Sequence, residues 1–313
     1  MQAWQFTEIG APLTLREVAD PQPAPDGIVI DTRAAGLCHS DVSFLDGTLT
    51  PLLPFAPITL GHEIAGVVSA VGSNVTGFTI GDRVGVPAAI EGPGTSSDGG
   101  FAPRVAVPAH LVVHVPESVA WEQAAAATDA GLTSYHAVVV RGQVRAGMKV
   151  GVIGLGGLGS LGAQIALANG AQVYVAEINE AVHPYARELG VQGISTGIDS
   201  FADEQLDVVI DFAGFGTTTA AAIETVRNRG RVVQVGLARP MGTINLNELT
   251  LKALDLVGSQ AGTKEDCSAV LELIAAGRLA SRITTITFEE IGEGIQRLES
   301  GEVVGRLVAQ VAG

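Results

Sequence analysis

Short apolar segments interrupted by glycine and proline dominate the first 120 residues. The segments 27–35, 63–72 and 104–108 each carry a run of Val, Ile and Ala next to Gly or Pro. Apolar runs of this length with turn residues at their ends are typical of β-strands. We therefore expect this part of the chain to form a small β-barrel.

The pattern changes after Ala120. An alanine-rich stretch from Trp121 to Val140 has helical character, and apolar strands then alternate with helices as far as about Val257. This alternation is typical of a parallel sheet covered by helices on both faces. A helix over 264–279 and a strand over 306–311 follow, and we expect this tail to return to the first domain.

The pattern as a whole predicts an α/β protein of two domains. The β-barrel covers residues 1–122, a doubly wound domain covers 123–258, and residues 259–313 return to the barrel. A chain of 313 residues with 47% hydrophobic content can fill a core in each domain. Only 4% of the residues are aromatic, whereas 40 are glycine. The interiors are therefore expected to consist of aliphatic side chains connected by many tight turns.

Charge and cysteine content exclude several classes of protein. The formal net charge of -15 repels nucleic acid and anionic lipid, so neither a nucleic acid nor a membrane is expected as a partner. The N-terminus has no basic segment followed by an apolar core, and no apolar run is long enough to suggest a membrane span, so we expect a cytoplasmic protein. Cys38 and Cys267 are too few for a disulfide framework, and each is taken as a lone thiol.

A glycine-rich turn lies between a strand and a helix in the second domain. The apolar segment 149–153 is followed by Gly154-Leu-Gly156-Gly-Leu-Gly159 and then by a helical run. Gly154 permits the tight turn, Gly156 leaves room for a pyrophosphate, and Gly159 lets the helix pack closely. Free N–H groups at the helix N-terminus also attract phosphate. The residues expected to contact the dinucleotide here are Gly154, Gly156, Gly157, Leu158, Gly159 and Val235.

An acidic residue follows the second strand of this domain. The strand over 172–176 ends in Glu177, which lies 23 residues after Gly154. A carboxylate at about this spacing accepts hydrogen bonds from the ribose hydroxyls, and its charge repels a 2′-phosphate. NAD is therefore expected as the cofactor, and NADP fits less well, although nearby basic side chains can override one acid.

Cysteine, histidine and acidic residues, which can bind zinc, occur at intervals between positions 38 and 129. Cys38 opens a Cys-His-Ser-Asp segment, His62 and Glu63 follow 24 residues later, and Asp129 precedes the dinucleotide domain. Thiolate, imidazole and carboxylate can together hold Zn²⁺ and leave one position for water or substrate. Each residue also has a structural alternative, as a small buried thiol for Cys38 or as a turn cap for Asp129.

These motifs follow one another in an order typical of a known family. Cys-His-Ser-Asp at 38–41, Gly-His-Glu at 61–63, Gly-Asp-Arg-Val-Gly at 81–85, Asp-Gly-Gly-Phe-Ala at 98–102, the glycine turn and Gly-Glu-Val-Val-Gly-Arg at 301–306 span nearly the whole chain. In this order the sequence resembles the zinc-containing medium-chain alcohol dehydrogenases. The resemblance implies a GroES-like β-barrel catalytic domain joined to a Rossmann domain, with the active site in the cleft between them.

The resemblance also implies roles for the residues of the Cys-His-Ser-Asp and Gly-His-Glu segments. Cys38 and His62 correspond to the first two zinc ligands, and Asp129 takes a third place that is Cys in most members. Asp41 corresponds to the residue that orients His62, a role in which carboxylates are common. The implied catalytic residues are Ser40, Glu63 and Asp41.

Two of these catalytic residues act on the substrate side of the implied site. Ser40 corresponds to the hydroxyl that hydrogen-bonds the alcohol and passes its proton outward. Glu63 corresponds to a nearby carboxylate able to ligate the zinc transiently when water leaves. His39 and Arg306 fall where relatives contact the cofactor phosphates, so both are expected to bind the cofactor.

One region departs from the family. Residues 87–98 contain none of the four cysteines that commonly hold a structural zinc in relatives, so a single catalytic zinc per chain is expected. The resemblance further implies a homodimer or homotetramer.

The expected function is the NAD(H)-dependent interconversion of a small-molecule alcohol and an aldehyde or ketone by hydride transfer. Two alternatives stay open. One is a zinc-free NAD(P)H-dependent reductase of a polarised C=C or C=N bond, and the other is a noncatalytic nucleotide-binding protein on the same fold. The zinc content of the protein distinguishes the zinc-free reductase from the alcohol enzyme. Catalytic turnover distinguishes either enzyme from the noncatalytic nucleotide-binding protein.

Overall fold

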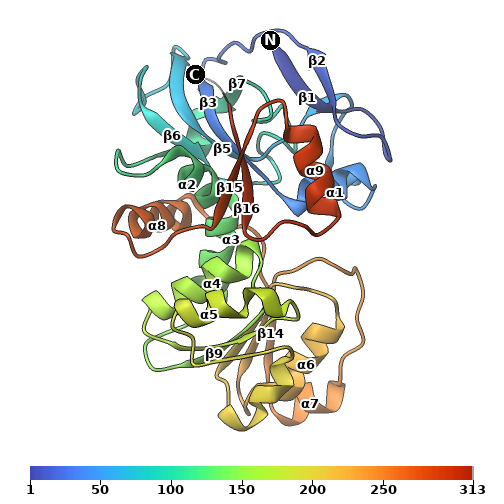
Figure 1. Ribbon diagram of the computed structural model, residues 1–313. Coiled ribbons are helices and arrows are strands. Elements are labelled where there is room, and N and C mark those ends of the chain that lie inside the picture. Colours follow the sequence, from blue (N-terminus) through green and yellow to red (C-terminus); the bar gives the residue numbers. More distant parts are fainter. Residues whose placement is uncertain (312–313) are drawn as a thin grey trace. The chain divides into compact units, whose positions relative to one another are not determined.

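The computed structural model describes residues 1–311, which fold into two compact units (Figure 1). The first unit contains Met1–Leu132 and the chain from Thr263 onward, and the second contains Thr133–Gly262. The chain enters the second unit at residue 133 rather than at the predicted 123, because the helix that begins at Trp121 packs first against strands of the first unit. The return to the first unit occurs at residue 263, against the predicted 259.

Two sheets build the first unit. The larger sheet has seven strands. Six of them follow the order β15 (Ile283–Thr287), β16 (Arg306–Gln310), β3 (Gly27–Leu37), β5 (Glu63–Val71), β6 (Arg83–Val86) and β8 (Val113–His114). The seventh strand, β7 (Arg104–Pro108), pairs with β3. The smaller sheet has the order β2 (Thr14–Glu17), β1 (Gln2–Phe6) and β4 (Ile58–Thr59). Strand β16 pairs antiparallel with β3, so the C-terminal segment completes the larger sheet.

Short helices connect these strands. They are α1 (His39–Leu45), the 3₁₀ turns η1 (Thr50–Leu52) and η2 (Ala109–Leu111), α2 (Trp121–Ala126), the π-helical turn η3 (Ala127–Gly131), α8 (Lys264–Ala275) and α9 (Ile291–Glu299). Helix α8 ends four residues before the predicted Leu279, because Gly277 adopts a positive φ of 67° that terminates the helix. In the described chain, residues 1–311, no helix is both long and apolar enough to cross a membrane.

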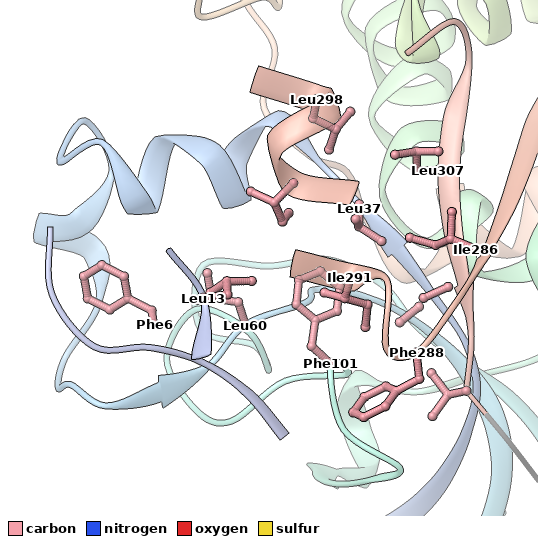
Figure 2. Packing of buried hydrophobic residues seen from close by; sticks show 14 of the residues in the cluster. Phe6, Leu13, Leu37, Leu60, Phe101, Ile286, Phe288, Ile291, Leu298 and Leu307 are labelled. Atoms are coloured by element: carbon pink, nitrogen blue, oxygen red, sulfur yellow. The ribbon is translucent and has the colours of Figure 1, made fainter. Parts of the chain in front are cut away.

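A hydrophobic core lies between α9, the C-terminal half of α1 and the end of β3 (Figure 2). Ile291, Ile295 and Leu298 are spaced four and three residues apart, so they form one apolar face of α9 that packs against Leu37 and Leu307. Burial of such side chains contributes about 1.5–3 kcal/mol each. This core fixes the end of β3, which is the position immediately before Cys38.

The second unit is a doubly wound parallel sheet, as the alternating pattern predicts. Its six strands follow the order β11 (Gly193–Ser195), β10 (Gln172–Ala176), β9 (Lys149–Ile153), β12 (Val208–Asp211), β13 (Arg231–Gln234) and β14 (Asp255–Gly258). The helices are α3 (Leu132–Tyr135), η4 (His136–Arg141), α4 (Gly157–Ala168), η5 (Glu180–Val182), α5 (His183–Glu188), η6 (Ile198–Glu204), α6 (Thr217–Thr225) and α7 (Leu246–Leu251). The strand order reverses between β9 and β12, and ligands of such sheets bind outside the strand ends at this point.

Candidate active site

Cys38 lies at the junction of β3 and α1. It is the N-cap of α1, and its backbone N–H donates a hydrogen bond of 2.9 Å to Oδ2 of Asp41. The N–H of Asp41 donates in return to the carbonyl of Cys38 at 3.0 Å. These reciprocal bonds cap the helix and hold the fully buried Asp41 carboxylate against the backbone N–H of Cys38.

His62 directly follows a tight turn at Gly61, and Glu63 begins β5. Gly61 has a φ of 90°, and a Cβ atom there would lie 2.7 Å from Cγ of Phe101, so the turn requires glycine. Glu63 pairs with Gly36 of β3, and a Cβ atom on Gly36 would overlap the Glu63 side chain. Because Gly36 has no side chain, the Glu63 side chain can occupy this position.

Asp129 comes from the π-helical turn η3. The N–H of Leu132 donates to the carbonyl of Ala127, five residues earlier instead of the four of an α-helix, and also to the carbonyl of Asp129. Turns of this kind are rare and occur frequently at functional sites.

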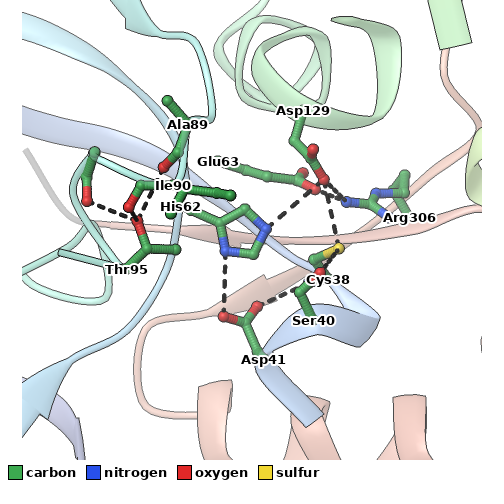
Figure 3. A network of polar contacts seen from close by, with 11 residues as sticks. Cys38, Ser40, Asp41, His62, Glu63, Ala89, Ile90, Thr95, Asp129 and Arg306 are labelled. Atoms are coloured by element: carbon green, nitrogen blue, oxygen red, sulfur yellow. Dashed lines mark hydrogen bonds and ion pairs between the residues drawn. The ribbon is translucent and has the colours of Figure 1, made fainter. Parts of the chain in front are cut away.

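The side chains of Cys38, His62, Glu63 and Asp129 converge (Figure 3). One ligand atom from each lies within 4.8 Å of all the others. Oδ2 of Asp129 lies 3.4 Å from Sγ of Cys38 and 3.7 Å from Nε2 of His62. The structure thus brings together residues that stand 91 positions apart in the chain.

These separations suit a tetrahedral zinc ion. Zinc bonds of about 2.3 Å to sulfur and about 2.0–2.2 Å to nitrogen or oxygen place the ligand atoms of a tetrahedron roughly 3.4–3.6 Å apart. The thiolate, the imidazole and the carboxylate of Asp129 match this spacing and chemistry. In the described residues, 1–311, no other group of three or more Cys, His, Asp or Glu side chains converges in this way.

The charges around His62 favour a cation at the site. Burial of the ring lowers its pKa, but the charge of Asp41 and the polar contacts with Asp129, Asp41 and Cys38 outweigh burial and raise the pKa well above its usual value. Nδ1 of His62 lies 3.5 Å from Oδ1 of Asp41, which orients the ring with Nε2 toward Asp129. A metal ion at Nε2 would take the place of the proton that these acids favour.

Ser40 and His39 occupy the first turn of α1. The Ser40 hydroxyl lies 3.6 Å from Sγ of Cys38, adjacent to the convergent group. His39 is exposed and is close enough to Arg306 to be influenced by its charge. The predicted contact between His39 and a cofactor phosphate stays a prediction.

Arg306 lies within the same polar group, which sequence reasoning did not anticipate. Its guanidinium pairs with the carboxylate of Glu63, and Nη2 lies 3.6 Å from Oδ2 of Asp129. The residue is only 4% exposed. One fixed positive charge therefore offsets part of the acidic charge at the site. The pairing of β16 with β3 creates this contact, and no local motif signals it. The predicted phosphate contact of Arg306 stays a prediction.

The loop over 87–98, which lacks the family's cysteines, is closed by hydrogen bonds. Oγ1 of Thr95 lies 2.8–2.9 Å from the carbonyl oxygens of Ala89, Ile90 and Gly92. The Thr95 hydroxyl proton is shared among these three carbonyl oxygens. The contacts hold the loop around the Thr95 side chain. Figure 3 shows this group on the His62 side of the site.

The two thiols are expected to differ in reactivity. Burial raises the pKa of Cys267 to about 12 from an ordinary 9.0, and its thiol therefore stays protonated and inert at pH 8. Zinc bound at the site would protect Cys38. We expect a thiol-specific reagent to modify neither cysteine in zinc-loaded protein, one in metal-free protein, and both after unfolding.

Mass spectrometry of the modified peptides identifies which thiol has reacted. Equal modification of Cys38 with and without zinc would contradict the proposed ligand. The raised pKa of Cys267 has a second consequence, because only the unfolded chain ionises this thiol between pH 9 and 12. Its contribution to folding stability is thus complete below about pH 9 and falls as the pH rises through that range.

The glycine turn of the second unit has the predicted geometry. Gly154 has a φ of 85°, Gly156 is the N-cap of α4, and the helix begins at Gly157. A Cβ atom on Gly159 would overlap the carbonyl of Gly154, whereas one on Gly156 would meet no protein atom within 4 Å. The open space over Gly156 and the N–H groups of the first turn of α4 fit a pyrophosphate.

The other predicted cofactor residues lie at the same edge of the sheet. Oε2 of Glu177 accepts a 2.6 Å hydrogen bond from the N–H of Leu155, so the acid is held beside the glycine turn. The carbonyl of Leu158 accepts from the Ser134 hydroxyl at 2.8 Å. Val235 is buried directly after β13. Their contacts with the cofactor stay predictions.

Asp211 at the end of β12 is a residue that sequence reasoning missed. Its buried carboxylate accepts hydrogen bonds of 3.0 and 2.9 Å from the N–H groups of Ala213 and Gly214 and of 2.7 and 2.9 Å from the hydroxyls of Thr218 and Thr219. Ala213 in turn lies next to Gly154. An acid at the end of an apolar strand, followed by Phe-Ala-Gly, was the available signal.

Comparisons with known proteins cover both units. Residues 24–117 match the family profile described as "Alcohol dehydrogenase GroES-like domain", and residues 157–276 match "Zinc-binding dehydrogenase". The predicted combination of a GroES-like and a Rossmann-type domain is thereby confirmed.

Relatives match the chain over its full length. An NAD-dependent alcohol dehydrogenase of Saccharolobus solfataricus is 30% identical, over 98% of this chain and 99% of the relative. An alcohol dehydrogenase of Geobacillus stearothermophilus is 28% identical over 99% and 100% of the two chains. The structure of acetophenone reductase from Geotrichum candidum in complex with NAD superposes with a TM-score of 0.89 at 29% identity, over 99% and 96% of the two chains.

Proposed function

Since the chain belongs to the zinc-containing medium-chain alcohol dehydrogenase family, we propose that it interconverts an alcohol and an aldehyde or ketone with NAD(H) at the Cys38, His62 and Asp129 group. It is an oxidoreductase that acts on a small-molecule substrate. The observation that supports the site most directly is the convergence of four metal-ligating side chains in a protein that also carries a dinucleotide turn.

Three residues would hold one zinc ion per chain. Cys38, His62 and Asp129 would bind an ion that, when present, acts as a Lewis acid on the alcohol oxygen, while bound NAD accepts the hydride. The mutual distances of 3.4 and 3.7 Å from Asp129 to the other two side chains support this set. Asp129 is a harder ligand than the more usual thiolate, so the site carries one soft donor instead of two.

The neighbouring residues orient the ligands and move the proton. Asp41 holds His62 at Nδ1 and so directs Nε2 inward. The Ser40 hydroxyl would accept the proton that the alcohol oxygen loses as the substrate carbon gives up hydride, and would pass its own hydroxyl proton outward to water. Arg306 neutralises Glu63 by their ion pair and limits the net negative charge around the ligands.

The second unit would bind the cofactor at the glycine turn. The space over Gly156 admits the pyrophosphate, and the first turn of α4 supplies N–H donors. Glu177 would accept the ribose hydroxyls and disfavour NADP. From the family resemblance we also propose a homodimer or homotetramer.

An NAD(H)-linked screen of alcohols, aldehydes and ketones, on protein whose zinc content has been measured, tests this function. We expect about one zinc per chain, turnover with NAD exceeding that with NADP, and loss of turnover after chelation that zinc restores. Turnover of C=C or C=N compounds by protein that contains no zinc would favour the zinc-free reductase. Absence of turnover across the panel by zinc-loaded protein would favour a noncatalytic nucleotide-binding protein.

A further inference from the structure

We propose that the π-helical turn Ala127–Gly131 positions Asp129 as a zinc ligand, and that its packing against β6 and α8 holds it in this form. This inference rests on the proposed zinc site. It assigns a positioning role to Thr128 and Gly131, which flank Asp129 but offer no side chain to the metal.

The hydrogen bonds of the turn show how it differs from an α-helix. In an α-helix the N–H of Leu132 would bond to the carbonyl of Thr128, but here it donates to the carbonyls of Ala127 and Asp129. The Thr128 carbonyl instead accepts a 2.8 Å hydrogen bond from the N–H of Ala88. Since each residue of an α-helix turns the chain by roughly 100°, the extra residue in this turn changes the direction in which neighbouring side chains point.

The bond from Ala88 connects Thr128, the residue before Asp129, to the pair of strands β5 and β6 beside His62. Ala88 follows β6, and β6 pairs with β5 through Ile64 and Val86. Strand β5 begins with Glu63, directly after His62. The carbonyl freed by the π turn therefore fixes the residue before Asp129 relative to the strand pair beside His62.

Close packing supports the turn on this side. A Cβ atom on Gly85 of β6 would lie 3.0 Å from Cγ2 of Thr128, so this methyl group sits against the strand backbone. The Thr128 hydroxyl donates a 2.7 Å hydrogen bond to the carbonyl of Ala125, and the whole side chain is buried. Thr128 thus contacts the strand with one branch and the preceding turn with the other.

Helix α8 packs against the opposite end of the turn. A Cβ atom on Gly131 would lie 2.7 Å from Cγ1 of Val270, which is closer than real side chains allow. Val270 is fully buried and β-branched, so it has little freedom to rotate away. A methyl group at Gly131 would therefore displace the turn, and with it the Asp129 carboxylate.

The test compares Gly131→Ala with the double variant Gly131→Ala/Val270→Ala, which restores the space. Zinc affinity is measured by competition with a chelator, and ligand geometry by the absorption spectrum of the cobalt-substituted protein. Changes to residues that orient metal ligands typically lower metal affinity 10–100-fold. We expect Gly131→Ala to weaken zinc binding by about 10–100-fold and to alter the cobalt ligand-field bands, and the double variant to regain most of both.

Val226→Ala, in the core of the second unit, is the matched control for loss of stability. It should lower the melting temperature without changing zinc affinity. If Gly131→Ala does not fold, Thr128→Val is tested instead, because valine keeps the shape of threonine but lacks its hydroxyl group. Thr128→Ser keeps the hydroxyl group and is the variant expected to rescue zinc binding.

The outcomes separate this inference from the proposed function. Wild-type affinity and an unchanged cobalt spectrum in Gly131→Ala, or a double variant no better than the single one, would overturn the positioning role while the zinc enzyme stands. Failure of the wild-type protein itself to bind zinc or cobalt would overturn the proposed function, and the inference with it.

Discussion

Replacement of Cys38 by alanine is expected to abolish stoichiometric zinc binding and to lower kcat/KM for alcohol oxidation by at least about a thousandfold, or roughly 4 kcal/mol of transition-state stabilisation. Cys38 is the only soft donor in the convergent group, and its Sγ lies 3.4 Å from the Asp129 carboxylate. Without the Cys38 thiolate, only His62 and Asp129 of the proposed ligands remain, and Glu63 is held in its ion pair with Arg306. Metal analysis after dialysis and steady-state kinetics measure the two effects.

The matched control is Cys267→Ala, which removes the second of the two cysteines in the chain. Cys267 is buried on α8 and is absent from the convergent group, so its variant should retain zinc and most of the activity. Full alcohol oxidation by metal-free Cys38→Ala protein would refute the proposed mechanism.

Replacement of Gly156 by valine is expected to weaken NAD binding by about a hundredfold, which corresponds to roughly 2.8 kcal/mol. A side chain at Gly156 meets no protein atom at its Cβ position, so the fold should tolerate it. The same side chain would fill the space that a pyrophosphate needs above the first turn of α4. Titration of NADH fluorescence and thermal unfolding measure binding and stability separately.

Gly258→Ala is the control for this variant. Gly258 lies on β14 in the same unit, and its Cβ position is also open, but it is far along the strand order from β9 and the glycine turn. We expect it to bind NADH as the wild type does. Wild-type affinity in Gly156→Val would show that the cofactor does not bind over the glycine turn.

Local motifs were sufficient to predict the parts of the site that depend on neighbouring residues. The strand, glycine turn and helix around Gly154 are contiguous in sequence, and their spacing alone predicts the turn geometry. The same holds for the start of β5 at Glu63, directly after His62, which the apolar segment 63–72 predicts. In each case the local chain determines the backbone, and the residue type determines the chemistry.

Contacts between distant segments were beyond sequence reasoning. The ion pair of Arg306 with Glu63 arises because β16 pairs with β3, and the spacing of 243 residues between them contains no signal for it. The π turn at Asp129 depends on a hydrogen bond from Ala88, and an alanine-rich sequence predicts only an ordinary helix there. Tertiary packing decides such features, and a periodic pattern does not record it.

The candidate ligands come from three separate parts of the first unit: the start of α1, the start of β5 and the turn after α2. An ion held by all three would join segments up to 91 residues apart, much as a disulfide staples a loop. The same zinc ion would then serve in catalysis and cross-link the three segments. Prolonged exposure to a chelator would cost the protein rigidity as well as turnover, and readdition of metal would have to reassemble the site before catalysis could resume.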